Sequence, residues 1–402
     1  MTSSETRPAG ARNERTRVLD SYDNNLPKRV RFGRGISGEL SSEIARLGRA
    51  SPFIITDAGV RGAGVLARVT GPLEKGGLSY GVFDGTQAEP PFNCVHEACE
   101  SAEKSGREVD VIVAIGGGSV IDTAKLVAAT LGDRRDAALL AGIGKVGRRP
   151  LPLVCIPTTS GTGSEATAVA IFTDIASGNK VGVVDACLVP DTVLLDPALT
   201  DGLPRLPTAA AGMDALVHAL EAYIGRTATP MARGLALEAA RWIGPALPAV
   251  CSDGTDHRAR DAMLIGANLA GMAFANSSCC GVHALALPLG GRFHIVHGVA
   301  TGCLAAETMR HNLPSCRGDF AVFAEALGWG DCEPDAFPGM LAQLAASIGL
   351  QSVLLASKVP DDSLELMARQ AVANRRLMDP NPRPISEAEA VGIYRRTLHS
   401  HG

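Results

Sequence analysis

The sequence Val109-Asp110-Val111-Ile112-Val113-Ala114-Ile115 runs directly into Gly116-Gly117-Gly118-Ser119, and this stretch decides the fold. A short apolar run rich in β-branched residues is typical of a strand buried on both faces of a parallel sheet. After the glycines the apolar residues change to helical spacing. A strand, a glycine turn and a helix N-terminus form an anion site, because free backbone N–H groups and the helix dipole point at the ligand. The stretch therefore predicts a phosphate-binding turn; the alternative is a plain turn between a strand and a helix.

Further apolar runs on both sides of this stretch predict more strands of the same sheet. They are Lys28–Gly33, Pro52–Asp57, Leu78–Phe83 and Leu153–Pro157. The stretches between them have helical patterns, with Ile36–Leu47 a clear amphipathic example. Strands that alternate with helices indicate βαβ units and a parallel sheet.

The texture of the sequence changes after about residue 205. From Ala209 onward the apolar residues recur at spacings of three and four. We therefore expect an α/β nucleotide-binding domain over residues 26–205 and an all-helical, metal-binding domain over residues 206–402. Residues 1–25, which begin with a polar stretch of mixed charge, are expected to be a disordered tail.

A second glycine-rich loop, Pro157-Thr158-Thr159-Ser160-Gly161-Thr162-Gly163-Ser164-Glu165, follows the last predicted strand. Small hydroxyl residues between glycines can form hydrogen bonds with a ribose or a phosphate without steric conflict. Two such loops at the carboxyl ends of parallel strands are typical of ligand binding by an open α/β sheet.

Four residues of the helical part form a candidate metal site. Asp214 and His218 are four residues apart in an otherwise apolar helical pattern, so they share one face of the helix. An unpaired carboxylate there would be costly, so either the two residues satisfy each other or both bind a ligand. His283 and His297 add two imidazoles, and one carboxylate with three imidazoles suits a divalent ion such as Fe(II) or Zn(II). The alternative is a set of satisfied core histidines.

The composition excludes several classes of function. The chain has 402 residues, is 46% hydrophobic and carries a net charge of −4 without a basic run, so no nucleic-acid partner is expected. It has no apolar segment of signal-peptide type and none long enough to span a membrane. We therefore expect a cytoplasmic protein with no membrane partner, in which the ten cysteines are free thiols.

Taken together, these motifs resemble those of the iron-dependent (group III) alcohol dehydrogenase family, over residues 26–395. Gly116–Lys125 is similar to the family's pyrophosphate loop, and Pro157–Glu165 to its nicotinamide-side loop. Gly212–Glu221 and His297-Gly298 resemble its metal signatures. The resemblance implies a cleft between the two domains, NAD(H) and one divalent metal as cofactors, and a homodimer or larger assembly.

The resemblance also assigns individual residues. It implies metal ligation by Asp214, His218, His283 and His297, and cofactor contacts from Asp57, Gly116, Gly117, Gly118, Ser119, Asp122, Thr158, Thr159, Thr162 and Lys180. Asp57 corresponds to the acid that binds the adenine ribose, and a carboxylate there would repel a 2′-phosphate, so we expect NADH rather than NADPH. Lys180 matches a lysine near the nicotinamide ribose. Leu287 departs from the pattern, because many members carry there a histidine assigned to proton relay.

These residues predict metal- and NADH-dependent reduction of a small aldehyde to its primary alcohol, or the reverse oxidation. The metal held by His297 and its partners would act as a Lewis acid. Arg292 could hold an anionic aldehyde such as phosphonoacetaldehyde, or be a solvated surface charge. His294 is a candidate proton donor if it faces the cleft, and otherwise a surface residue. The rival hypotheses are an NAD- and metal-using lyase of the dehydroquinate synthase type and a catalytically silent binding protein.

Overall fold

The structure is a computed structural model, and it describes residues 21–133, 135–175 and 180–399. Its N-terminal half is built on six parallel strands in the order β1-β9-β6-β4-β2-β3. The strands are β1 (Arg29–Phe32), β2 (Pro52–Ile55), β3 (Gly81–Phe83), β4 (Val111–Gly116), β6 (Leu153–Pro157) and β9 (Thr192–Leu195). Five of them lie where apolar runs predicted strands. The sixth, β9, was not predicted, because a run of four residues does not stand out from apolar helical segments.

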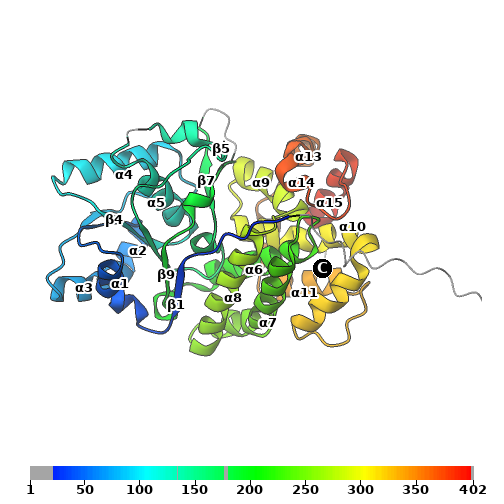
Figure 1. Cartoon of the computed structure of the whole chain (residues 1–402). Coiled ribbons are helices and arrows are strands. Elements are labelled where there is room, and N and C mark those ends of the chain that lie inside the picture. Colours follow the sequence, from blue (N-terminus) through cyan, green and yellow to red (C-terminus); the bar gives the residue numbers. More distant parts are fainter. Residues whose placement is uncertain (1–20, 134, 176–179, 400–402) are drawn as a thin grey trace, which may run out of the picture.

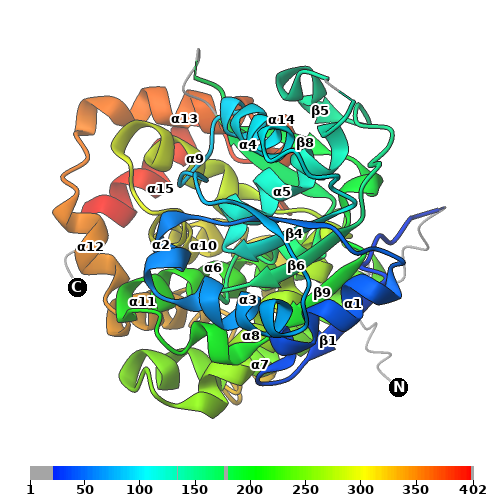
Figure 2. The ribbon, with the colours of Figure 1, turned by 90° about the vertical axis from the view of Figure 1, so that its left-hand side faces the viewer.

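Strand β4 shows why the central run is continuously apolar. Val111, Val113 and Ile115 pack on one face of the sheet, and Ile112 and Ala114 pack on the other. The first face is covered by α1 (Leu40–Arg46) and α3 (Val65–Lys75), and the second by α4 (Asn93–Lys104) and α5 (Gly118–Thr130). Figure 2 shows the two pairs of helices on opposite sides of the strands, with the short α2 (Ala58–Gly62) after β2.

A second, three-stranded sheet lies beside the main one and was not predicted. Its strands are β5 (Gly142–Ile143), β8 (Lys180–Val184) and β7 (Val169–Thr173), in that order. Strands β7 and β8 pair antiparallel, from Val169–Val184 to Thr173–Lys180. This pairing fixes Lys180 at the start of β8.

The C-terminal half is helical, as predicted, and lies to one side of the sheets in Figure 1. Its helices are α6 (Arg205–Ile224), α7 (Pro230–Ser252), α8 (His257–Ala275), α9 (Gly281–Phe293), α10 (His297–Ala326), α11 (Phe337–Ser347), α12 (Leu350–Ala356), α13 (Leu364–Ala373), α14 (Arg375–Met378) and α15 (Glu387–His399). Helix α6 is almost wholly buried from Thr208 to Ile224 and contributes heavily to the largest apolar core. Among the described residues no single helix is long and apolar enough to cross a membrane; only α11 and α12, bent by 76°, pass as a pair.

The segment before β1 crosses from the sheet to the helical half (Figure 1). The predicted tail falls mostly on residues 1–20, which lie outside the described residues. The backbone N–H of Asn25 donates to Asn276 Oδ1, and Asn276 Nδ2 donates to Asn25 O at 3.1 Å. The end of the predicted tail is therefore held in place at the C-terminal end of α8.

Candidate metal centre and nucleotide-binding loops

Helix α6 presents three functional side chains on one face. Asp214, His218 and Glu221 are spaced by four and three residues, so they follow one another along the helix. The side chains of Asp214 and His218 are 5% and 7% exposed, and Glu221 is fully buried. Their placement in the apolar core requires partners from other elements.

The four predicted metal ligands come together at this face. His283 lies in the first turn of α9, and His297 is the first residue of α10. Asp214 Oδ1 lies 3.7 Å from His283 Nε2 and 3.6 Å from His297 Nε2, while Asp214 Oδ2 lies 3.8 Å from His218 Nδ1. These separations are close to the roughly 3.3 Å that metal bonds of about 2.0–2.1 Å produce at tetrahedral angles.

A glycine lets α10 approach α6 closely enough for this arrangement. A β-carbon at Gly298 would lie 2.0 Å from the carbonyl oxygen of Ala210, so a side chain cannot be placed there without a shift. The close contact fixes His297 beside Asp214, which lies one turn along α6 from Ala210.

The donor set fits a divalent first-row ion. His218 Nδ1 and His283 Nε2 are buried without a hydrogen-bond partner in the described part of the chain, which is costly unless a ligand engages them. Burial lowers the pKa of His218 to about 3, so this imidazole stays in the neutral form that binds metals. Burial opposes ionisation of Asp214, but the facing histidines, His218 first, hold its pKa below the usual range. One carboxylate and three imidazoles suit Fe(II) or Zn(II).

Two further residues, which the sequence motifs did not mark as functional, orient the ligands. Glu221 Oε2 pairs with His283 Nδ1 at 2.6 Å, which leaves Nε2 as the nitrogen for an ion. The hydroxyl of Thr301 donates to Asp214 Oδ1 at 2.9 Å. The available signal for Glu221 was its position seven residues after Asp214, on the same helical face.

His297 is the most exposed of the four predicted ligands. The side chain of His297 is 40% exposed, while those of Asp214, His218 and His283 are at most 7% exposed. Arg292 and His294 lie at the C-terminal end of α9, both exposed, and His294 ends the helix in the left-handed conformation (φ 54°). Their side chains make no ion pair or hydrogen bond within the described residues, so nothing in the fold ties either one to the four ligands.

The predicted phosphate turn joins β4 to α5. A β-carbon at Gly116 would lie 2.6 Å from the Val120 side chain, and one at Gly118 would lie 2.8 Å from that of Thr162. The backbone can therefore be this tight only with glycine at both positions. Ser119 follows in the first turn of α5, where backbone N–H groups are free for an anion.

The second loop, Pro157–Glu165, lies between the glycine turn on one side and helices α6 and α8 on the other. On one side Thr158 N–H donates to Gly116 O at 3.1 Å, and Thr159 and Thr162 face Gly117 and Gly118. On the other side the loop touches α6 and α8, since β-carbons at Gly161 and Gly163 would lie 2.7 Å from the Ala211 side chain and 2.5 Å from Gly271 Cα. This loop thus connects the predicted cofactor site with the metal centre.

Asp122 braces the loops from inside. It is buried, and its two oxygens accept hydrogen bonds from the Ser164 hydroxyl and, at 2.9 Å, from Ile171 N–H. Burial raises its pKa. Both oxygens are engaged within the protein, so Asp122 supports the cofactor loops; its predicted contact with the cofactor stays a prediction.

Asp57 and Lys180 lie at the edges of the cofactor region. Asp57 follows β2 and caps α2, with Oδ1 accepting from Val60 N–H at 2.8 Å. Lys180 Nζ pairs with Glu89 Oε2 at 2.9 Å, and burial lowers its pKa. Glu89 has a left-handed backbone (φ 53°), and its N–H donates to Ser119 Oγ at 3.3 Å. Lys180 is thereby linked to the glycine turn.

Comparison with known proteins agrees with this arrangement. Residues 27–197 match the family model of iron-containing alcohol dehydrogenases, and residues 208–398 match the C-terminal model of the same family. Long-chain-alcohol dehydrogenase 1 of Geobacillus thermodenitrificans is 36% identical over 92% of this chain and 95% of that protein. Sulfoacetaldehyde reductase of Bilophila wadsworthia is 33% identical over 91% of this chain and 96% of that protein. The crystal structure of sulfoacetaldehyde reductase from Bifidobacterium kashiwanohense in complex with NAD+ superimposes with a TM-score of 0.86 at 26% identity, covering 95% of this chain and all of the other.

Proposed function

The chain belongs to the iron-containing alcohol dehydrogenase family, and on this premise we propose that it reduces a small anionic aldehyde to its primary alcohol with NADH, and catalyses the reverse oxidation. The main support for this proposal is the Thr158–Ser164 loop, which contacts both the glycine turn and α6, the helix that holds Asp214 and His218. A hydride donor at one and a carbonyl oxygen at the other would be held side by side.

The residues of the chain divide the chemistry between them. When bound, the ion supplies Lewis acidity and the nicotinamide supplies the hydride. Asp214, His218 and His283 form the buried part of the centre, with Glu221 and Thr301 fixing two of them. The exposed edge of His297 marks the side on which a substrate oxygen can enter. Fe(II) is the ion that we propose, with Zn(II) as the alternative.

Proton delivery involves the open side of the centre. Leu287 packs against the apolar core and carries no proton to donate. The proton for the reduced oxygen therefore comes from water, from a ribose hydroxyl of the cofactor, or from the exposed His294.

The anionic substrate class has two supports. Arg292 is an exposed guanidinium in the last turn of α9, five residues before the predicted ligand His297. Two of the similar proteins are named for sulfoacetaldehyde, an aldehyde that carries a sulfonate. Guanidinium groups bind such oxyanions through paired, charge-assisted hydrogen bonds, and phosphonoacetaldehyde offers the same chemistry.

An NADH-oxidation screen over small aldehydes, run with metal analysis, tests the function. A dehydrogenase oxidises NADH in the presence of an aldehyde, whereas a lyase of the dehydroquinate synthase type or a silent binding protein does not. Arg292→Ala should raise the KM for an anionic aldehyde about tenfold to a hundredfold, and that for a neutral aldehyde of equal length much less. Arg258→Ala, an exposed arginine on α8, is the matched control. Equal effects of Arg292→Ala on both aldehydes would dismiss the anionic class and leave a neutral substrate, such as a long-chain alcohol.

A further inference from the structure

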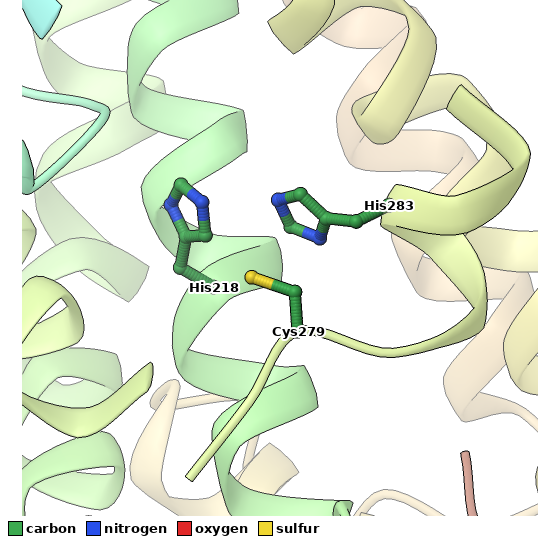
Figure 3. Close-up of side chains that lie close together, drawn as sticks. All are labelled: His218, Cys279 and His283. Carbon is green, nitrogen blue, oxygen red and sulfur yellow. The ribbon is translucent and has the colours of Figure 1, made fainter. Parts of the chain in front are cut away.

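Cys279 lies between α8 and α9, and its sulfur faces two of the metal ligands. Figure 3 shows the Cys279 side chain beside the facing rings of His218 and His283. One donor atom from each of these three residues lies within 4.8 Å of the other two. Both histidines are 5% exposed, and each keeps a buried ring nitrogen without a hydrogen-bond partner. We propose that Cys279 is a fifth ligand, which gives the metal centre a thiolate sulfur.

The neighbouring cysteine makes the position of Cys279 informative. Cys280 is turned toward Glu221, with its N–H donating to Glu221 Oε2 at 2.8 Å and its sulfur 3.7 Å from Glu221 O. Cys280 therefore belongs to the packing that holds Glu221 behind His283. Cys279, one residue earlier, directs its sulfur to the imidazole rings themselves.

The sulfur is close to the same ion that the other donors would hold. The donor atoms of Asp214, His283 and His297 form a second compact group, and it shares His283 with the group that contains Cys279. Since Glu221 engages Nδ1 of His283, Nε2 is the nitrogen that remains for an ion in either group. His218 also lies 3.8 Å from Asp214, so an ion bound by both His218 and His283 would lie beside the Cys279 sulfur.

Sulfur ligation has definite chemical consequences. Metal binding replaces the thiol proton, which passes to solvent, and no oxidation or reduction occurs. An Fe(II) centre accepts six ligands, so the sulfur would displace no histidine and would leave one position for a substrate oxygen. A soft thiolate favours borderline ions such as Zn(II), Fe(II) and Co(II) over hard ions such as Mg(II). The inference rests on the proposed metal centre but not on the substrate.

Cobalt substitution of the full-length protein tests this ligand directly. One equivalent of Co(II) should give visible ligand-field bands from the histidine-rich centre and, in addition, a near-ultraviolet sulfur-to-cobalt charge-transfer band. Ligand-field bands without the sulfur band would overturn the role of Cys279 while leaving the metal centre intact. Failure to bind Co(II) would overturn both, so the two ideas fail separately.

Variants then assign the band to one sulfur. Cys279→Ser should lose the charge-transfer band, keep the ligand-field bands, and bind Zn(II) more weakly than the wild type. Cys99→Ser changes another half-buried cysteine, on α4 in the other half of the molecule, and should keep the band. A band that persists in Cys279→Ser would come from another cysteine and contradict the proposal. Because the wild-type spectrum already decides the main question, the test does not depend on how well a variant folds.

Discussion

Replacing Glu221 with glutamine turns the carboxylate that orients His283 into an amide of nearly the same shape. The fully buried carboxylate accepts hydrogen bonds from Cys280 N–H at 2.8 Å and Val282 N–H at 2.7 Å, and pairs with His283 Nδ1 at 2.6 Å. An amide offers one oxygen for these three groups. In one orientation Val282 N–H loses its acceptor, and in the other Cys280 N–H and His283 do.

Either orientation leaves at least one buried N–H unsatisfied, which costs about 1–3 kcal/mol of the apoprotein's free energy of unfolding. Loss of the carboxylate charge also makes His283 Nε2 a weaker metal ligand, so we expect metal affinity to fall by about tenfold to a hundredfold. Chelator competition measures the affinity, and denaturant unfolding of the metal-free protein measures the stability.

Glu43→Gln is the matched control. Glu43 is also buried, but its partners are Arg29, Arg31 and Arg46, in the other half of the molecule. This variant should lose stability and keep its metal affinity. A folded Glu221→Gln protein with wild-type metal affinity would refute the reasoning that Glu221 acts through His283.

Three other predictions concern the cofactor, the helix contact and acid stability. Asp57→Asn keeps the cap on α2 but removes the charge that repels a 2′-phosphate. The ratio of kcat/KM for NADH to kcat/KM for NADPH should therefore fall at least about fivefold. A wild type that already prefers NADPH would contradict this prediction. Gly298→Ala should lower the free energy of unfolding by about 1–3 kcal/mol or more and weaken metal binding. Gly234→Ala, on α7 with open space around it, should raise the free energy of unfolding by up to about 1 kcal/mol. Equal melting temperatures for the two variants would be inconsistent with the close contact between Gly298 and Ala210. Burial opposes ionisation of Glu43, but its arginine partners outweigh this effect and lower its pKa. The carboxylate therefore stabilises the fold above its ordinary pKa, and this stabilisation is lost as the pH falls through the lowered pKa. The free energy of unfolding of Glu43→Gln should therefore fall less than that of the wild type between about pH 6 and about pH 3, and parallel curves for the two proteins would disprove this role.

The features that could be predicted from sequence are those with local determinants. The apolar run of β4, its glycine turn and the four-residue spacing of Asp214 and His218 depend only on neighbouring residues. The predicted fold class, an α/β domain followed by a helical domain, is confirmed by the structure and by its similarity to the sulfoacetaldehyde reductase structure. The family resemblance is confirmed as well.

The features that could not be predicted depend on contacts between distant segments. Glu221 and His283 are 62 residues apart, and their contact depends on where the first turn of α9 lies beside α6. The hydrogen bond from the Ser164 hydroxyl to Asp122 likewise joins residues 42 positions apart, so the glycine motif around Asp122 gives no sign of it. The pairing of β7 with β8 likewise decides where Lys180 lies, and four of the residues between them lie outside the described part of the chain.

One ion, held by Asp214, His218, His283 and His297, is what we propose makes the chain a dehydrogenase. Titration of the metal-free protein with Fe(II), followed by the rate of aldehyde-dependent NADH oxidation, tests it most directly. We expect the rate to rise linearly and to stop rising at one ion per chain, and we expect no rise in Asp214→Ala. A rate independent of added metal, or one restored equally in Asp214→Ala, would contradict it.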